Sequence, residues 1–359
     1  MAENWQNETA KYADELLDLA ARLYATPEQA YHERLTVNVW AEFAARHNLH
    51  YSTALGGRAP LISLGDDHRA VTRVALPADL DAVGLRRGQG VQWSHLCGHH
   101  AQSVAALGAM LLLQAGGIPD DLAVTAVGCP AEECLPAFVP DCDIPFIPGK
   151  AHLLSEGVFS RTTAVLGTHL ADALPQRAMV LAHGAHGGLW IRIHKNNDGE
   201  LLDAAGEILG GCAVSMSITP FSPTEYDLRV ETAPCAGEAV PRGRQVIAAL
   251  HKRGFRARLV AEYAPLLHEE ALRRLARKVM IQGGESDEIE WIDALWLDGM
   301  TDLGDVSQRI PTLQVFVGGT AGTLHQPSFA VTDPAFSYVW PAWFLAAMTR
   351  TVHDAIAKE

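Results

Sequence analysis

The sequence predicts an α/β protein into which a smaller domain is inserted. Short apolar runs typical of buried strands alternate with helical segments over most of the 359 residues. Between residues 184 and 263 the order becomes strand, helix, strand, strand, helix, strand, which is the split-βαβ arrangement. We therefore expect residues 1–183 and 264–359 to form one larger domain with a mixed sheet flanked by helices, and residues 184–263 to form a separate small domain.

The first part of the larger domain begins with helical periodicity and continues with strands. Apolar residues recur at helical spacing over 8–24 and about 35–46, and the nearly all-apolar segment 102–114 predicts a buried helix. Four apolar runs predict strands at 61–64, 71–76, 122–127 and 163–166. The Pro-rich stretch 135–148 predicts a long loop, and loops of that length are more often functional than accidental.

The same periodicities divide the rest of the chain. In the inserted segment we expect strands at 190–194, 213–219, 225–230 and 255–262, and helices at 199–209 and 240–252. Beyond it we expect a helix over 268–280, a loop over 298–308, a strand over 313–317 and an amphipathic helix over 334–357.

Composition and charge exclude several classes of protein. Apolar residues make up 48% of the chain and charged residues 19%, so it can bury a sizeable core. The formal net charge of -14 argues against nucleic-acid or anionic-membrane binding, since both require a basic patch. No signal peptide is visible, and the longest apolar run, 104–113, is too short to span a bilayer. Six cysteines match no disulfide framework, so we expect a cytoplasmic protein with reduced thiols.

Polar side chains gather near the ends of the predicted strands. Asp79 and Asp81 follow one strand, and the pair Glu132 and Glu133 follows another. The segment 95–100, His-Leu-Cys-Gly-His-His, precedes the buried helix. Open α/β sheets place their sites at the carboxyl ends of strands, and such side chains suit a metal-dependent hydrolase. Because charges at strand ends are costly to bury without a cation, we favour a metal centre over solvated acids and a merely buried cysteine.

Five short segments resemble the signature set of the peptidase M20 family. They are Ala78-Asp-Leu-Asp-Ala, His95-Leu-Cys-Gly-His, Pro130-Ala-Glu-Glu, Gly167-Thr-His and His325-Gln-Pro-Ser-Phe. Within the family they look like the amidohydrolase branch, which includes auxin-conjugate and aminobenzoyl-glutamate hydrolases. The stretches 149–150 with 156–159, and 301–307, are similar to the aminobenzoyl-glutamate type.

The resemblance implies a phosphorylase/hydrolase-like catalytic domain with an inserted ferredoxin-like lid, often used for dimerisation. It also implies one or two divalent ions per subunit, manganese or zinc. The residues that resemble the metal ligands are Cys97, His99, Glu133, His169 and His325. By this likeness Cys97 bridges two ions, His99 and His169 complete one shell, and Glu133 and His325 complete the other. Glu132 resembles the general base, and Asp81 resembles the carboxylate that orients a ligand histidine.

The chemistry of these residues agrees with the implied roles. Two divalent ions would hold the bridging thiol deprotonated, and imidazoles and carboxylates suit zinc and manganese. If the strand end is extended, adjacent side chains diverge, so Glu132 stays off the ion that Glu133 ligates and can accept a proton from water. Asp81 fits the rule that a ligating histidine donates its other N–H to a carboxylate.

The chain departs from the family pattern at three places, and one is the loop 135–148, whose Phe138 and Phe146 either line the pocket or pack on the core. The pattern Cys-Gly-His-Asp-x-His is here Cys-Gly-His-His100-Ala-Gln, so His100 is an extra ligand, a proton carrier or a histidine packed in the helix turn. The lid lacks the family's Gly-rich segment with a histidine and its Asn-Ile-Pro element. The candidates to replace that histidine are His194, Asn196 and Asn197, each of which could instead be a turn residue. His183 and His186, at the hinge into the lid, are candidates for contact with substrate.

Three functions remain open from the sequence. The first is a hydrolase of the amide C–N bond in an N-acyl or aryl-acyl amino-acid-type small molecule. It would use metal-bound hydroxide as nucleophile and Glu132 as general base, and would form a homodimer through the lid. The second is an aminohydrolase that releases ammonia from an aryl amine on the same metal site. The third is an inactive metal-binding relative that serves as a binding module, which the retention of Glu132 and Asp81 disfavours.

Overall fold

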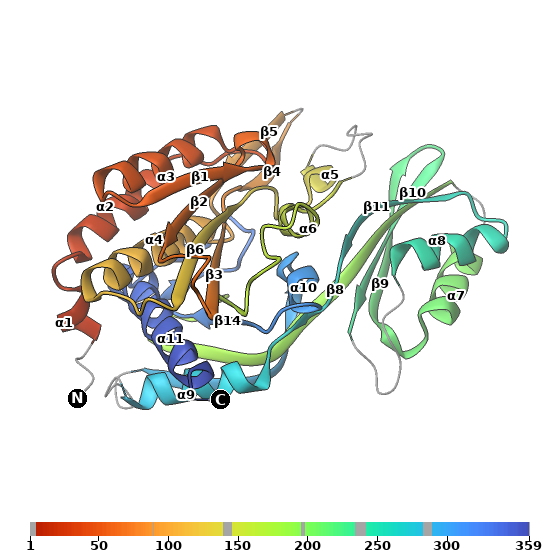
Figure 1. Cartoon of the computed structure of the whole chain (residues 1–359). Helices are drawn as coiled ribbons and strands as arrows, with labels where there is room; N and C mark the ends of the chain where they lie inside the picture. The colour runs from red at the N-terminus through yellow and green to blue at the C-terminus, as the bar shows by residue number, and fades with distance from the viewer. Residues whose placement is uncertain are drawn as a thin grey trace.

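One large sheet runs through the molecule and sets the position of the other elements (Figure 1). The computed structural model describes residues 5–88, 90–138, 146–194, 198–233, 242–282 and 289–358. The strand order is β1-β2-β6-β3-β7-β14-β8-β10-β9, and β11, β12 and β13 also pair with β8. Parallel and antiparallel pairs both occur and helices flank the sheet, which confirms the predicted α/β class with a mixed sheet.

Parallel pairing in the centre of the sheet determines where the loops lie. From the β1 edge inward, this part of the sheet consists of β1 (His50–Ala54), β2 (Ala59–Leu64), β6 (Leu122–Cys129), β3 (Thr72–Asp79), β7 (Ala164–Leu170) and β14 (Thr312–Val317). β3 runs parallel to β6 and to β7, and β7 runs parallel to β14. The carboxyl ends of β3, β6, β7 and β14 therefore lie on the same side of the sheet, and so do the loops that follow them. Two hairpins lie outside the sheet: β4 (Val83–Arg87) with β5 (Gly90–Ser94), and β15 (Thr320–Ala321) with β16 (Ala330–Val331).

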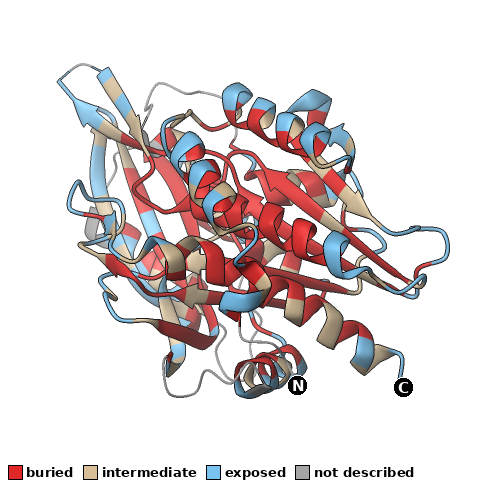
Figure 2. Cartoon of the chain, turned by 90° about the vertical axis from the view of Figure 1, so that its left-hand side faces the viewer, coloured by how far each residue is buried: buried red, intermediate tan, exposed pale blue. Residues whose placement is uncertain are grey.

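Helices cover both faces of the central strands because strand side chains alternate between the faces. Val74 and Leu76 pack into a core with the first set of helices, and Ala75 points to the second set. The first set is α1 (Trp5–Thr9), α2 (Ala13–Tyr24), α3 (Arg34–Arg46), α4 (His99–Gly116), α9 (Glu270–Gln282) and α11 (Trp340–Ile356). The second is α6 (Gly149–Ser155) and α10 (Leu303–Ser307). Figure 2 shows the buried positions concentrated on the strands and on the inward faces of the helices.

The N-terminus of α4 brings a loop against the end of β7. The helix begins at His99, three residues before the predicted start, because Gly98 takes a left-handed φ of 86° as its N-cap. A Cβ on Gly98 would lie 2.9 Å from the side chain of Leu170, so glycine permits this close approach. The close approach places Cys97 and His99 beside the end of β7, next to His169.

A single long strand, β8 (Ala178–His194), serves two parts of the molecule. Its first half pairs with β14, with β12 (Leu266–Leu267) and with β13 (Glu290–Met300). Its second half pairs with β10 (Glu225–Thr232) and β11 (Ala257–Tyr263), and β9 (Ala213–Ser222) completes a four-stranded antiparallel arrangement. α7 (Asp198–Leu209) and α8 (Gly243–Lys252) pack on one face of it through a separate apolar core. The 183/184 boundary that we predicted falls inside this strand.

Several predicted elements were wrong in extent. We predicted a strand only over 190–194, whereas β8 begins at Ala178. In the structure a Cβ on Gly184 would lie 2.0 Å from the carbonyl oxygen of Leu266, so the glycine admits a neighbouring strand. The predicted loop 298–308 contains the end of β13 and all of α10, because Leu303 and Val306 are fully buried.

The predicted Pro-rich loop and the predicted C-terminal helix also differ from the structure. The loop 135–148 begins with the short helix α5 (Leu135–Phe138), and residues 139–145 lie outside the described part. The C-terminal helix starts with a wider π turn, Ala335–Val339, before α11. Pro341 has no N–H to donate to Ser337, which accounts for the irregular turn.

The thiols and the helices bear on the expected cellular context. Cys212 is disulfide-bonded, so the expectation of reduced thiols is wrong at this position, while Cys97, Cys129 and Cys134 form no disulfide. Spacing alone could not identify a bonded cysteine because pairing depends on distance in the fold. No helix in the described ranges has the length and apolar character needed to cross a bilayer.

The packing of α4 against α11 makes a prediction about one glycine. Gly108→Ala should destabilise the protein by about 1–3 kcal/mol, because its Cβ would lie 2.6 Å from the Cβ of Ala342. Gly206→Ala on α7 is the matched control, since its nearest contact would be a methionine tip at 3.5 Å. That change should stabilise by about 0.4–1 kcal/mol through the unfolded chain. Urea unfolding of both variants tests this, and equal effects would contradict the packing argument.

Candidate metal centre

The predicted site residues converge at the edge where the parallel strands end. Asp81 follows β3, Glu132 and Glu133 follow β6, and His169 is the penultimate residue of β7. Cys97 and His99 come from the start of α4, and His325 comes from the segment between β15 and β16. Residues more than two hundred positions apart in the chain are thus brought into contact.

The thiol of Cys97 lies among three imidazoles. Its sulfur is 3.5 Å from Nε2 of His169 and 3.1 Å from Nε2 of His325. His99 joins the same group, since its ligand atom lies within 4.8 Å of those of Cys97 and His169. Cys97 and His99 are buried, whereas half of the His325 side chain is exposed, so the cluster is open on one side.

Both carboxylates of the Glu132–Glu133 pair reach this cluster. Nε2 of His99 lies 3.7 Å from Oε2 of Glu132 and 4.0 Å from Oε1 of Glu133. Oε1 of Glu133 is also 3.4 Å from Nε2 of His325. The sequence argument that adjacent side chains diverge assumed an extended strand end, and this was wrong. β6 ends at Cys129 and Ala131 has a left-handed φ of 57°, so the two carboxylates turn toward the same imidazole.

The ring orientations are fixed from behind. Nδ1 of His99 lies 3.0 Å from the carbonyl oxygen of Asp81 and 3.3 Å from its Oδ1. Nδ1 of His169 donates to the carbonyl oxygen of Leu170 at 2.7 Å. Donation from Nδ1 leaves the lone pair of Nε2 directed at the cluster, as in metal-ligating histidines. Asp81 also accepts the backbone N–H of Glu133 at 2.9 Å through Oδ2, so one carboxylate positions two site residues.

This donor set fits divalent ions. Three groups of ligand atoms lie within 4.8 Å of one another: Cys97, His99 and His169; Cys97, Glu133 and His325; and His99, Glu132 and Glu133. The first two share the thiol and have the composition that the resemblance implied for two ions. Nε2 of His99 and Oε1 of Glu133 are buried without a hydrogen-bond partner, as expected of atoms that would ligate a cation. Binding at these atoms stays a prediction.

Burial and charge set the protonation of the cluster. Burial raises the pKa of Glu132 well above its usual value, and the negative charges of Asp79 and Glu133 raise it further. Burial and the Cys97 thiolate raise the pKa of Glu133 to about 8. Burial opposes ionisation of Cys97, but the neighbouring imidazoles hold the pKa of its thiol well below its ordinary value. The raised pKa values favour the protonated forms of Glu132 and Glu133 without a cation, so metal uptake should release protons.

A buried ionic group behind Glu132 was not assigned a role from the sequence. The ammonium of Lys150 on α6 contacts the carboxylates of Asp79 and Asp302, and Asp302 also accepts the Lys150 N–H at 2.7 Å. All three side chains are at most 1% exposed. The signal was present, because Lys150 and Asp302 lie in the two stretches that resemble aminobenzoyl-glutamate hydrolases. Gln102 joins the group by accepting the N–H of Asp79 at 3.1 Å.

The four further histidines named from the sequence are outside the ligand groups found among the described residues. His100 is buried, with Nε2 2.9 Å from the hydroxyl of Tyr338, so it is packed in the helix turn. His183 contacts Arg273 of α9 at 3.0 Å. His186 stacks on Trp296 of β13.

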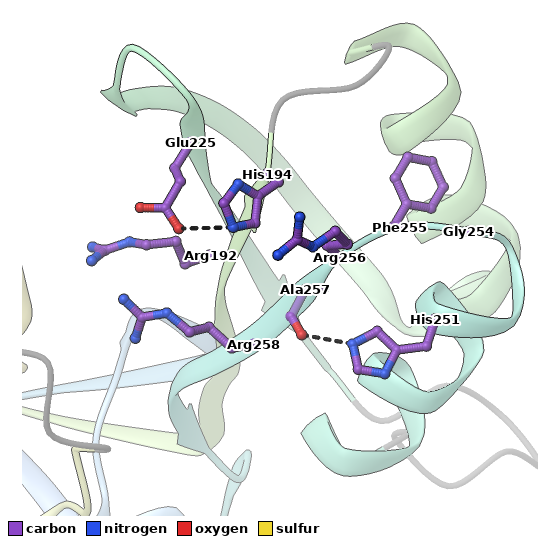
Figure 3. A pocket seen from close by; sticks show the side chains of 9 residues that line it. All are labelled: Arg192, His194, Glu225, His251, Gly254, Phe255, Arg256, Ala257 and Arg258. Carbon is purple, nitrogen blue, oxygen red and sulfur yellow. Dashed lines mark hydrogen bonds and ion pairs between the residues drawn. The ribbon is translucent and has the colours of Figure 1, made fainter.

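His194 is the last residue of β8. It lines a cavity of about 570 Å³ and pairs with Glu225 at 3.8 Å, and Arg192, Arg256 and Arg258 line the same cavity (Figure 3). The structure therefore gives His194 a carboxylate partner on the neighbouring strand β10. The other two candidates, Asn196 and Asn197, lie outside the described residues.

The fold has well-defined relatives among solved structures, although no family model matches the chain. A dinuclear metal-binding peptidase of the M20 family from Bacillus subtilis is 17% identical, with a TM-score of 0.69 over 96% of this chain and 99% of that chain. A protein named as an aminohydrolase from methicillin-resistant Staphylococcus aureus is 16% identical, with a TM-score of 0.69 over 98% of each chain.

A third solved structure with the same fold is an amidase. An amidase of the hydantoinase/carbamoylase family from Burkholderia vietnamiensis is 13% identical, with a TM-score of 0.58 over 94% of this chain and 97% of that chain. These likenesses cover 94–98% of this chain and show that it shares the fold of an M20 peptidase, in agreement with the predicted fold class.

The buried ionic group predicts a large effect of one substitution. Lys150→Met should destabilise the protein by about 3–5 kcal/mol, because it leaves the carboxylates of Asp79 and Asp302 buried without a cation. Arg161→Met is the matched control, since its pair with Asp67 is half-exposed and should contribute at most about 1 kcal/mol. Denaturant unfolding measures both. Similar losses in the two variants would show that the Lys150 group is not a buried ionic network.

Proposed function

We propose that the protein is a metal-dependent hydrolase that cleaves an amide C–N bond in an N-acyl or aryl-acyl amino-acid-type small molecule. The observation that carries this proposal is the cluster in which Cys97 belongs to two ligand groups, with Glu132 beside it. The M20 peptidase and the amidase with the same fold support this reaction class.

The side chains divide into holding and proton-moving roles. Cys97, His99, Glu133, His169 and His325 would hold one or two divalent ions, and we propose manganese or zinc. Ions bound there supply an acidified water and stabilise negative charge on the substrate oxygen. Asp81 keeps His99 in the ligating tautomer and fixes the backbone of Glu133.

Glu132 is suited to the role of general base. Its carboxylate lies at the cluster, is 8% exposed and has a raised pKa caused first by burial. A raised pKa brings a carboxylate closer to the operating pH, where it can both accept a proton and return it to the leaving nitrogen. In one of the three ligand groups Glu132 and Glu133 both lie beside His99, so the division of roles between the two carboxylates is a proposal.

Further features belong to the same proposal. We propose that residues 1–183 with 264–359 act as the catalytic domain and that residues 184–263 act as a lid through which two copies form a homodimer. The small molecule would bind between them, in a cytoplasmic enzyme without nucleic-acid or membrane partners. The similarity of residues 149–150 and 301–307 supports the aminobenzoyl-glutamate type of amide.

A second candidate reaction is the release of ammonia from an aryl amine on the same site. The aminohydrolase name of the structure from Staphylococcus aureus favours it. Ammonia release from aryl amines without cleavage of acyl amino acids would select this reaction. A binding module without activity is disfavoured because a pure binding protein has no need for a general base such as Glu132 or for the supporting carboxylate of Asp81.

Removal of metal should abolish hydrolysis. We expect a chelator to remove activity on acyl amino acids and added manganese or zinc to restore it, and elemental analysis should find one or two ions per subunit. Cys97→Ala should lose metal, because both ligand groups share that thiol. Cys129→Ala is the control, since it removes a buried free thiol on β6 outside those groups. Full activity of metal-free protein would contradict the proposal.

Loss of the carboxylate of Glu132 should lower turnover without removing metal. Glu132→Gln keeps the size of the side chain but cannot accept the proton, so kcat should fall by about 10²–10⁴-fold. Elemental analysis of the purified variant separates this effect from loss of ligands. Glu42→Gln, an exposed glutamate paired with Arg22, should behave as the unmodified protein. A Glu132→Gln protein with full kcat would remove Glu132 from the mechanism.

A further inference from the structure

Glu33 lies outside the ligand groups but contacts the loop that carries Glu132 and Glu133. It precedes α3 and is 2% exposed. Its Oε1 accepts two backbone N–H bonds, from Tyr31 at 2.8 Å and from Ala131 at 2.8 Å. One carboxylate oxygen therefore joins the segment before α3 to the loop after β6.

Both donors have an unfavourable backbone conformation. Tyr31 has a φ of 63° and Ala131 has a φ of 57°, so both are in the left-handed region. Non-glycine residues rarely occupy this region, and neither a tyrosine nor an alanine side chain can hydrogen-bond locally to stabilise it. Such residues persist only where the surroundings hold them. The shared oxygen of Glu33 holds both N–H groups in place.

The conformation of Ala131 determines where the next two side chains point. Beyond it, the carbonyl oxygen of Glu132 accepts the hydroxyl of Tyr263 at 3.1 Å, and the N–H of Glu133 donates to Asp81. If Ala131 relaxed to a right-handed or extended conformation, the following peptide would rotate. The carboxylates of Glu132 and Glu133 would then leave the neighbourhood of Nε2 of His99.

α6 blocks one route of relaxation. The N–H of Gly149 donates to the carbonyl oxygen of Ala131 at 3.1 Å, and a Cβ on Gly149 would lie 1.6 Å from the carbonyl oxygen of Pro130. The loop is thus held at Ala131 from two sides, with Glu33 on the N–H and α6 on the carbonyl oxygen.

We propose that Glu33 is a positioning residue of the candidate metal centre, acting through the backbone of Ala131 on Glu132 and Glu133. Its effect on turnover rests on the proposed hydrolase function, whereas its effect on metal uptake does not.

Metal titration of the free protein tests this inference first. Glu33→Ala removes the acceptor of both N–H groups, and we expect zinc to bind about 10–100-fold more weakly, the size of effect typical of residues that support ligands. Glu33→Gln retains an acceptor oxygen on a side chain of the same length and should restore the affinity. If Glu33→Ala does not fold, Glu33→Asp replaces it, since a side chain shorter by one methylene cannot reach both donors.

Glu28→Ala is the matched control for general damage to this segment. The carboxylate of Glu28 accepts the N–H of Leu35 at 2.9 Å and the N–H of Thr36 at 2.8 Å, at the start of α3. Its loss removes as many backbone hydrogen bonds as the loss of Glu33, but none to the Ala131 loop. Its melting temperature should fall while its zinc affinity stays unchanged. Equal weakening of zinc binding in Glu28→Ala and Glu33→Ala would overturn the proposal.

Amide hydrogen exchange gives a readout that needs neither metal nor substrate. The N–H of Ala131 should exchange faster in Glu33→Ala than in Glu28→Ala, and Glu33→Gln should restore its protection. Unchanged exchange and unchanged zinc affinity in Glu33→Ala would sink the inference. With substrate, kcat should fall while KM changes little. If the protein binds zinc but hydrolyses no amide, the proposed function is refuted. The zinc affinities and the hydrogen exchange of Ala131 still test the role of Glu33.

Discussion

The parallel pairing of β3, β6 and β7 is the constraint on which the candidate site depends. Because the three strands run in the same direction, the segments that follow them emerge at one edge of the sheet. The shared strand direction brings Asp81, Glu133 and His169 to the same side of the sheet. α4 then adds Cys97 and His99, since Gly98 lets its N-terminus approach the end of β7. A change of strand direction anywhere in the centre would scatter the cluster.

The charge balance at this edge explains why a cation belongs there. Asp79, Asp81, Glu132, Glu133 and Asp302 are all buried, and Lys150 supplies the ammonium that contacts two of them. Lys150 neutralises part of this charge behind the site, which leaves the side facing the imidazoles acidic. Burying that much negative charge is costly, and it is consistent with the raised pKa values of Glu132 and Glu133. One or two divalent ions would neutralise the negative charge that Lys150 leaves uncompensated.

The sequence predicted those parts of the molecule that local patterns encode. Asp81 and Glu132 were visible because each lies beyond an apolar run, the motif around Cys97 was visible because it precedes an apolar helix, and the fold class followed from the order of the runs. Glu33 was not assigned because its partner Ala131 lies 98 positions away and no periodicity connects them, and the resemblance around Lys150 did not reveal its pairing with Asp302, 152 positions away. The first part of β8 was not predicted as a strand, although neighbouring strands require its glycines there. The backbone of Ala131 could not be predicted either, because an alanine gives no signal for a left-handed φ.

The case of His99 and His100 shows how little separates a ligand from a packed residue. Consecutive residues of an α-helix point about 100° apart, so only one of the two can face the cluster. The choice depends on where α4 begins, and the sequence placed that start at Gln102, inside the helix. With the start at His99, the first histidine faces Asp81 and Cys97, and the second faces Tyr338 on the far side. The sequence motif therefore supplies the histidines, but the position at which α4 begins determines which of them faces the cluster.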